Sequence, residues 1–253
     1  MAKKRILLKI GSNTLTRETN HISRGKIEDI GMQIAALQDE YEFIIVSSGA
    51  IAAAKQFVKL ESKGKEIVVK QALASIGQPH LMRIFHENFS DLGLLTSQCL
   101  LSYSDFEKEQ SKVNIVNTIN VLVENNYIPI INENDTVATD EIQFGDNDKL
   151  AALAGVLLNV DLLIIATNTN GIYTKASIND EIPETIRIVT DLKLMQQEVG
   201  DSKSTLGTGG MQSKIEAAAI AKSATLETWI VNGLHDNFIF NAINNSIPFT
   251  KII

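Results

Sequence analysis

The sequence has a single cysteine, Cys99, among 253 residues. A disulfide within the chain is therefore impossible, and this composition is typical of proteins in a reducing compartment. Cys99 lies in the apolar stretch 94–101 with no histidine close to it in sequence. We expect a buried structural thiol there rather than a nucleophile.

Long hydrophobic runs and an excess of positive charge are also missing. No apolar run approaches the roughly 20 residues that span a bilayer, and residues 1–6 are too briefly apolar for a signal peptide. The formal net charge of −7 gives no electrostatic reason to bind nucleic acid or an anionic membrane. These features predict a cytoplasmic protein with neither nucleic acid nor membrane as a partner.

Several common site motifs are absent. The sequence has no Gly-x-x-x-x-Gly-Lys-Ser/Thr loop, and segment 207–212 begins like a dinucleotide fingerprint but ends in Gln212. Segment 105–107 lacks the glycine of a protein-kinase Asp-Phe-Gly motif. The four histidines do not have metal-ligand spacing. They are His21, His80, His86 and His235.

Short apolar runs recur along the chain, bounded by polar or turn residues. Because these runs do not alternate with polar residues, they predict strands buried on both faces, as in a parallel sheet. The runs are 6–8, 43–46, 128–131, 162–165 and 229–231.

Helical patterns lie between these runs. Apolar residues at 27, 30, 34 and 37 share one helical face, and Ser23 is a candidate N-cap. A second apolar face is predicted at 115, 119 and 122, a third at 211, 215, 218 and 219, and an apolar helix over 150–158. Alternating strands and helices predict a doubly wound α/β sandwich, and the sequence has no internal repeat. We expect one domain, 1–253, with a soft boundary near 158–161.

Ligands of open parallel sheets bind beyond the carboxyl ends of the strands. Polar or small residues follow four of the predicted strands. They begin at Lys9, Ser47, Asn132 and Thr167. Turns are usually polar, but that tendency explains Lys9 and the dense cluster at 132–135 less well.

Three glycine-containing segments could let backbone N–H groups approach an anion. They are 11–12, 48–49 and 207–211. The last leads into the helix that carries Lys214, so it reads equally well as a phosphate cradle or as a surface loop with a solvated lysine. Segment 145–149 could cap the next helix, but two acids and an asparagine exceed what a cap requires.

Such a set of groups suits phosphoryl transfer to a carboxylate. That reaction needs two anions held in line and their charge compensated by lysines, N–H groups and a metal ion. A carboxylate acceptor is already ionised at neutral pH, so no general base is required.

Five segments in this order resemble the glutamate 5-kinase branch of the amino acid kinase superfamily, over nearly the whole chain. They are 9–12, 46–51, 131–135, 145–148 and 207–214. The resemblance implies a three-layer αβα sandwich around a mainly parallel sheet. Its amino-acid-binding part would be about 1–158 and its nucleotide-binding part 159–253.

The resemblance also implies an activity: transfer of the ATP γ-phosphoryl group, with Mg²⁺, to L-glutamate. The product, L-glutamyl 5-phosphate, begins proline biosynthesis. Feedback inhibition by proline and assembly into a homo-oligomer are implied as well. The ligands of the metal are not indicated.

Roles for individual residues follow from the same resemblance. Lys9 and Lys214 would flank the transferring phosphoryl group, and Asp148 would hold both lysines. The substrate contacts would be Ser48, Gly49, Asn132, Asn134, Asp135 and Asn147. The nucleotide contacts would be Lys9, Gly11, Ser12, Thr167, Asn168, Thr208, Gly209, Gly210, Met211 and Lys214.

The chain departs from the branch at two points. Asn168 stands where such kinases usually have aspartate. The sequence also stops at Ile253, soon after the kinase core, so we expect the C-terminal PUA domain of many bacterial members to be absent. The alternatives are another kinase of the superfamily, such as acetylglutamate kinase or aspartokinase, and a non-catalytic amino-acid sensor. A sensor would need neither Lys9 nor Lys214.

Overall fold

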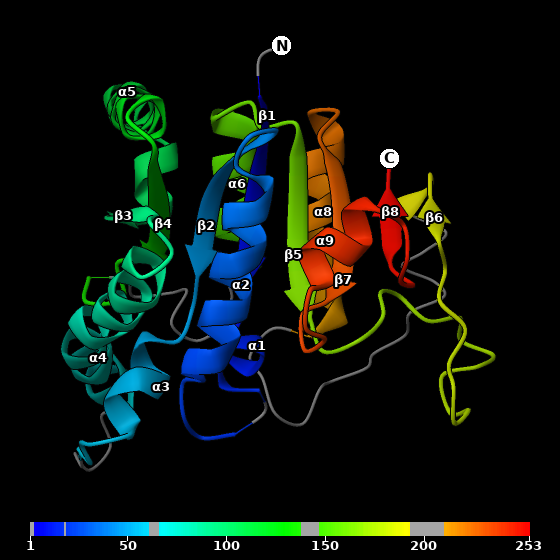
Figure 1. Ribbon diagram of the computed structural model, residues 1–253, viewed down its shortest axis with the longest axis horizontal. Coiled ribbons are helices and arrows are strands. Elements are labelled where there is room, and N and C mark those ends of the chain that lie inside the picture. Colours follow the sequence, from blue (N-terminus) through cyan, green and yellow to red (C-terminus); the bar gives the residue numbers. More distant parts are fainter. Residues whose placement is uncertain (1–2, 18, 61–65, 138–146, 193–209) are drawn as a thin grey trace.

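The computed structural model describes residues 3–17, 19–60, 66–137, 147–192 and 210–253. Its centre is an eight-stranded sheet in the order β3-β4-β2-β1-β5-β7-β8-β6 (Figure 1). The strands are β1 (Lys4–Ile10), β2 (Tyr41–Ser47), β3 (Leu95–Leu101), β4 (Tyr127–Glu133), β5 (Leu162–Thr167), β6 (Ile188–Val189), β7 (Glu227–Asn232) and β8 (Thr250–Ile252).

The sheet is mainly parallel, as predicted. Neighbouring strands from β3 through β7 are all parallel, whereas β8 runs antiparallel to β7 and parallel to β6. All five predicted strands are confirmed as β1, β2, β4, β5 and β7, each somewhat longer than its apolar run. The remaining three strands lie toward the two edges, where less burial leaves a weaker apolar signal.

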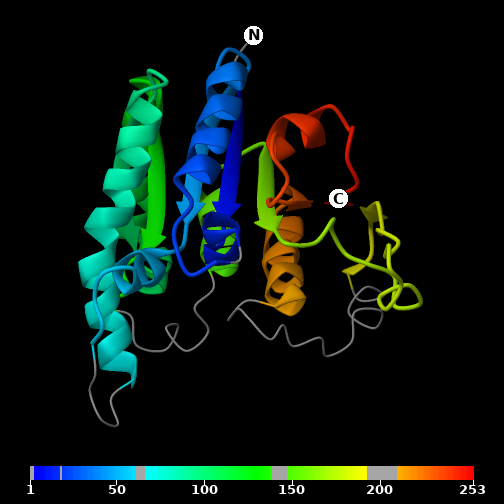
Figure 2. The ribbon, with the colours of Figure 1, turned by 60° about the horizontal axis from the view of Figure 1, so that its bottom comes forward.

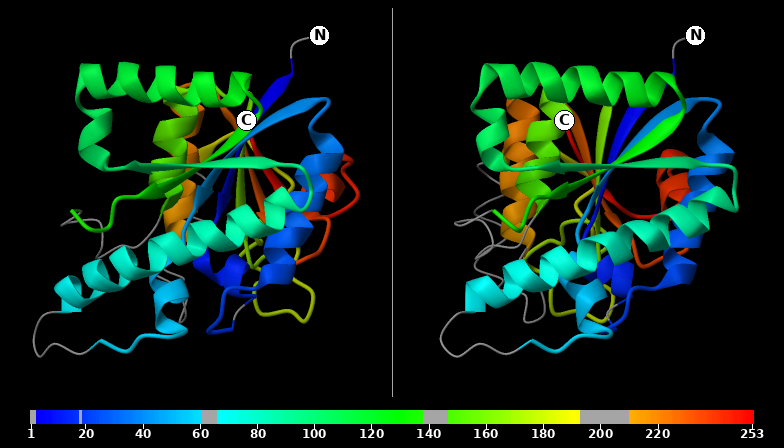
Figure 3. Two further views of the ribbon diagram at one scale, coloured as in Figure 1. Left: turned by 60° about the vertical axis from the view of Figure 1, so that its left-hand side comes forward. Right: turned by 90° about the vertical axis from the view of Figure 1, so that its left-hand side faces the viewer.

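Helices cover both faces of the sheet, which confirms the three-layer sandwich. α6 and α8 cover one face, and α2 and α9 cover the other (Figure 3). The helices are α1 (Ser12–Thr16), α2 (Arg24–Leu37), α3 (Ala50–Lys55), α4 (Glu66–Ser90), α5 (Glu109–Glu124), α6 (Asn147–Leu157), α8 (Met211–Ser223) and α9 (Phe238–Ile243), with a 3-10 turn, η1, at Tyr103–Phe106.

The predicted helices are present, with local corrections. Ser23 does cap α2, because its hydroxyl accepts a hydrogen bond from the Lys26 N–H at 3.2 Å. In α5, Val123 rather than Leu122 completes the buried face. α6 already includes Asn147 in its first turn, so residues 147–149 belong to the helix that we expected to begin at 150.

Residues of β1 alternate between the two faces of the sheet. Ile6, Leu8 and Ile10 pack into the core beneath α2, whereas Leu7 packs into the core beneath α6 and α8. Since side chains two residues apart share a face, Lys9 points to the side of α6 and α8. This geometry brings a strand lysine to two helices that follow much later in the chain.

α3 and α4 pack at unusually close range. A Cβ atom added at Gly77 of α4 would lie 1.7 Å from the carbonyl oxygen of Ala50, at the start of α3. Gly49, just before α3, has a φ of 107°, which glycine tolerates better than other residues. Glycines therefore fix the position of the segment that follows β2.

Cys99 corrects one prediction. It lies on the edge strand β3 and is half-buried rather than buried. Desolvation nevertheless raises the pKa of its thiol to about 11, which keeps it protonated at neutral pH.

The two halves of the sheet come from the two halves of the chain. β1 to β4 form one half of the sheet and β5 to β8 the other, joined where β1 pairs with β5. The division into two functional parts near 158–161 stays a prediction.

Among the described residues, no helix is both long enough and apolar enough to cross a membrane.

Candidate functional site

The polar segments that follow the parallel strands share one edge of the sheet, which Figure 2 turns toward the viewer. Ile10 pairs with Ser47 on one side and with Ala166 on the other, so β1, β2 and β5 end together. The strand ends are thus adjacent, as the sequence predicted.

A buried group of charges forms one part of the site. The Lys9 ammonium contacts Oδ1 of Asp148, and the Lys214 ammonium lies 3.0 Å from Oδ2 of the same carboxylate. The exposed fractions are 4% for Lys9, 0% for Asp148 and 7% for Lys214. One carboxylate therefore holds two ammonium groups from different elements, β1 and α8. The part that these three residues would take in phosphoryl transfer stays a prediction.

The carboxylate of Asp148 is well placed by its own helix. It lies in the first turn of α6, where the helix dipole favours a negative charge. The hydroxyl of Ser213 in α8 lies 3.2 Å from Oδ2 of Asp148 and 2.8 Å from the Gly210 carbonyl oxygen, and its single hydrogen can be donated to either acceptor. The start of α8 is thereby tied to α6.

A neutral network of amides forms the second part of the site. Nδ2 of Asn147 donates to Oδ1 of Asn132 at 2.7 Å and to the Ser47 carbonyl at 2.7 Å, and lies 3.2 Å from Oγ of Ser48. Asn132 and Asn147 are both buried. Three predicted substrate contacts, at 48, 132 and 147, are therefore joined directly.

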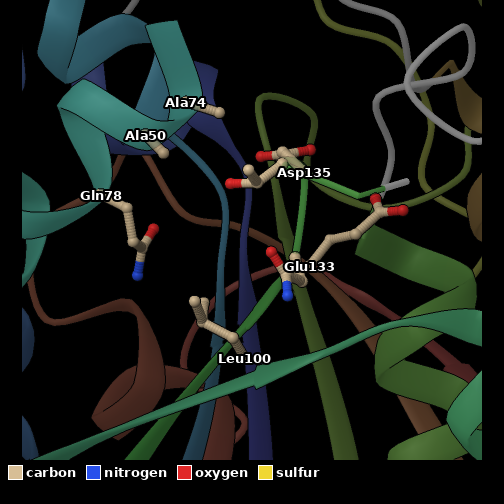
Figure 4. A pocket seen from close by; sticks show the side chains of 8 residues that line it. Ala50, Ala74, Gln78, Leu100, Glu133 and Asp135 are labelled. Atoms are coloured by element: carbon tan, nitrogen blue, oxygen red, sulfur yellow. The ribbon is translucent and has the colours of Figure 1, made fainter. Parts of the chain in front are cut away.

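Asp135 lines a pocket next to this network. Figure 4 shows Ala74 and Gln78 of α4 on one side of the pocket, and Glu133 and Asp135 on the other. Burial raises the pKa of the Asp135 carboxyl to about 6. Within the described residues its carboxylate has no hydrogen bond or ion pair, so nothing there indicates that it caps its own loop.

Other predicted substrate residues lie around the same pocket. Asn134 lines it, and the Asn134 N–H donates to the Leu101 carbonyl at 2.8 Å, which ties the segment after β4 to β3. Gly49 precedes Ala50, another lining residue. The substrate residues named from the sequence are thus gathered in one region.

The glycine segment after β1 lies beside the charged group. A Cβ atom added at Gly11 would lie 3.6 Å from the Lys9 ammonium, and Ser12 begins α1. The small residue leaves space for an anion to approach that ammonium.

The predicted nucleotide residues are placed less closely together. Thr167 ends β5, and its carbonyl accepts from the Gly233 N–H at 2.7 Å, while Asn168 next to it is exposed. Gly210 and Met211 form the start of α8. Thr208, Gly209 and the predicted acid Asp146 lie outside the described residues.

α2 holds the segment that follows β7. Lys26 is fully buried, donates to the His235 carbonyl at 2.6 Å and pairs with Asp29 at 2.8 Å. Desolvation lowers the pKa of Lys26, and the ion pair with Asp29 opposes that shift. Sequence reasoning missed this pair, and the spacing of residues 26 and 29 on one helix was the available signal.

Gln78 was also missed. It lines the pocket and bonds to Asn132, but it lies in a helix whose local sequence gives no sign of a site.

In the described part of the chain, no group of three or more His, Cys, Asp or Glu side chains could hold a metal ion.

The fold and these strand-end groups define a known class of protein. Residues 4–232 match the amino acid kinase family, and the chain belongs to that family. Its relatives include proteins named glutamate 5-kinase. The Vibrio vulnificus (strain YJ016) protein is 36% identical over 99% of this chain and 66% of its own length. The Bacillus cereus (strain ATCC 10987 / NRS 248) protein is 38% identical over 92% and 64%. The Dehalococcoides mccartyi protein is 41% identical over 99% and 68%.

The chain thus spans about two thirds of the length of these relatives. Solved structures with the same fold include UMP kinase from Ureaplasma parvum, with a TM-score of 0.67 at 17% identity over 100% of this chain and 99% of that one. Carbamate kinase from Giardia lamblia bound to AMP-PNP has a TM-score of 0.69 at 16% identity, with the same coverage. At these identities the likeness concerns the fold alone.

Proposed function

We propose that this chain transfers the γ-phosphoryl group of ATP to the side-chain carboxylate of L-glutamate, giving L-glutamyl 5-phosphate. The observation that carries the proposal is the pocket in which the partly buried Asp135, which has no ion-pair partner among the described residues, lies beside the amide network. The names of the relatives, at 36–41% identity, support it independently.

The acceptor would bind with its α-ammonium near Asp135. Burying that cation requires an acidic partner, and the ammonium would in turn favour the ionised carboxylate. Asn132, Asn134, Asn147 and Ser48 supply neutral polar groups for the rest of the amino acid. The side-chain carboxylate is itself the nucleophile, so no histidine or other base takes part.

The charged group would stabilise the phosphoryl group in transit. Lys9 and Lys214 are fixed on the two oxygens of Asp148, so both cations are positioned before the reaction begins. Such preorganised charges are the main source of catalysis in phosphoryl transfer. Gly11 leaves room for the anion beside Lys9.

ATP and Mg²⁺ are the proposed cofactors. The nucleotide would lie between the carboxyl end of β5, with Thr167 and Asn168, and the start of α8, with Gly210 and Met211. Mg²⁺ supplies charge neutralisation on the phosphates when it is bound, and it commonly keeps several waters and phosphate oxygens as ligands. The resemblance further supports proposals of feedback by proline, a homo-oligomer, a cytoplasmic location and the division into parts near residue 158.

Acetylglutamate kinase activity is the nearest alternative, and the two substrates separate it from our proposal. N-acetylglutamate has no α-ammonium, so it would leave Asp135 desolvated and unpaired. Losing one partner of such a pair costs roughly 30-fold to several thousand-fold in affinity. We therefore expect kcat/KM for L-glutamate to exceed that for N-acetylglutamate by at least about 30-fold in a coupled ADP-release assay.

Two outcomes of this assay would reject the proposal. Equal kcat/KM values, or a preference for the acetylated substrate, would favour acetylglutamate kinase. If no amino acid in a panel that includes aspartate supports ADP release, the result would favour a sensor. The buried Lys9 and Lys214, which a sensor does not require, argue against that second outcome.

A further inference from the structure

The amide network continues beyond the residues that the sequence had indicated. Oε1 of Gln78 accepts a hydrogen bond from Nδ2 of Asn132 at 2.8 Å, and Nε2 of Gln78 donates to Oε1 of Gln98 at 3.0 Å. Gln78 is 8% exposed, whereas Gln98 on the edge strand β3 is exposed. The chain of amides therefore runs from the sheet edge through α4 to the start of α6.

A backbone group fixes the direction of this chain. The N–H of Glu133 can only donate, and it donates to Oδ1 of Asn132 at 2.9 Å. Nδ2 of Asn132 must then face Gln78, which has to present its oxygen. No amide in the middle of this chain can turn over without placing two donors or two acceptors against each other.

The same constraint reaches Asn147. Its Nδ2 faces Oδ1 of Asn132 and the carbonyl of Ser47, both of which only accept. Asn147 therefore keeps its Oδ1, an acceptor, for other contacts, and this polarity suits a donor such as an ammonium group. Asn147, a predicted substrate contact, is thus linked through Asn132 to the amide of Gln78, which lies two hydrogen bonds away and completes the hydrogen bonds that hold Asn132 in place.

Gln78 also touches the pocket itself. Its side chain lines the cavity opposite Asp135, as Figure 4 shows. The preceding residue, Gly77, makes the close contact with the backbone of α3. The helix therefore delivers Gln78 to the pocket from a fixed position.

We infer that Gln78 is a positioning residue for the acceptor amino acid, which acts by holding Asn132 and, through it, Asn147 in the orientation that binds substrate. This inference rests on the proposed function only in taking this pocket as the acceptor site. It concerns binding geometry, so its effect falls on the KM of the acceptor rather than on ATP.

Gln78→Met tests the inference in the full chain. Methionine is similar in length and suits a helix, but it leaves the Asn132 donor without a good acceptor. We expect the KM of L-glutamate to rise about tenfold or more, because a buried donor loses its partner. The KM of ATP should stay within about twofold, and the effect on kcat should be smaller than that on the glutamate KM.

Gln98→Met is the matched control, since it removes only the outermost and exposed hydrogen bond. Its glutamate KM should stay within about twofold of wild type. Gln78→Asn is a second variant, which keeps an amide on the helix but shortens it beyond reach of Asn132. It should raise the glutamate KM as Gln78→Met does. The test can therefore be read from either variant if the other fails to fold.

An unchanged glutamate KM in either folded Gln78 variant would overturn the inference. So would equal rises in the KM of ATP and glutamate that follow a lowered Tm, since a merely structural role predicts that pattern. If wild type phosphorylates a different amino acid, the proposed function fails, and the same comparison on the KM of that acceptor still decides the role of Gln78.

Discussion

Two neighbouring residues at the start of α6 belong to two different kinds of chemistry. Asn147 joins the neutral amides of β4 and the segment after β2, and Asp148 joins the lysines of β1 and α8. Successive positions on a helix point in directions about 100° apart, so one helix start serves both groups. Under the proposed function, substrate geometry and phosphoryl charge would be handled by separate side chains that share one helix start as their support.

The two groups are buried for different reasons. Amides can be buried at little cost when each donor and acceptor is matched, and their directional bonds then specify an orientation. Ammonium groups need a counter-charge to be buried, and Asp148 supplies it to both. We therefore expect substitutions in the charged group to lower kcat and those around the pocket to change the KM of the acceptor.

Lys214→Ala should produce the largest effect. Removing one cation from the transferring phosphoryl group should lower kcat by about 10²- to 10³-fold, on the scale of losing one transition-state stabiliser. The KM of glutamate should change much less, and steady-state kinetics measures both. Lys222→Ala, on the last turn of the same helix, is the control and should leave kcat near wild type.

A normal kcat in Lys214→Ala would remove the charged group from the mechanism. Because Lys9, Asp148 and Lys214 share contacts through one carboxylate, their effects should not multiply. The triple alanine variant should be far less impaired than the product of the three single losses. A multiplicative result would separate the lysines into independent roles.

Asp135→Asn should have an effect of intermediate size, weakening the binding of glutamate while stabilising the fold. The KM of glutamate should rise about 10- to 100-fold, because the amide keeps an oxygen but loses the charge that pairs with the ammonium. In wild type, kcat/KM for glutamate should fall as pH drops through about 6, the pKa of this carboxyl in the substrate-free protein. A pH profile should show that titration in wild type and not in the variant.

The stability of the same variant should change in the opposite direction. The folded pKa of about 6 exceeds the unfolded value of about 3.9, so the folded protein binds the proton more tightly. The resulting stabilisation is complete below about pH 4 and is lost as pH rises through about 6. At pH 7, Asp135→Asn should therefore raise the free energy of unfolding by about 1–3 kcal/mol in urea titrations. Asp91→Asn, at an exposed site, should have no such effect.

Asn168→Asp should have the smallest effect. This exposed position at the end of β5 is the one at which the chain departs from the usual aspartate. The KM of ATP should change by a few-fold, as expected of one solvent-accessible polar contact, while the KM of glutamate stays nearly constant. A change confined to glutamate would place residue 168 in the acceptor pocket and weaken the separation between the two groups.

The sequence predicted the features that local patterns encode. Continuous apolar runs predicted β1, β2, β4, β5 and β7, because strands buried on both faces have no polar positions. The edge strands β6 and β8 have only two and three residues, too few to produce a pattern. A helical face is wide enough to admit either Leu122 or Val123, so the apolar pattern alone does not show which of the two is buried.

The charged group could be predicted from the sequence, whereas the far end of the amide network could not. Lys9 and Lys214 follow recognisable segments, and the strand ends explain why they meet. Gln78 lies 54 residues before Asn132, and only tertiary packing reveals that the two amides face each other. Residues that act through such long-range contacts carry no local signal in a single sequence.

The close approach of α3 and α4 sets a limit on the variation that this chain can accept. Every residue other than glycine has a Cβ atom, and at position 77 that atom would overlap a backbone oxygen that cannot move aside alone. In a library that randomises each glycine codon, active clones should return only glycine at 77. At Gly25 in α2, where an added Cβ meets nothing within 4 Å, they should return many residues. The position of α3 and α4 beside the pocket would thus depend on a residue that has no side chain.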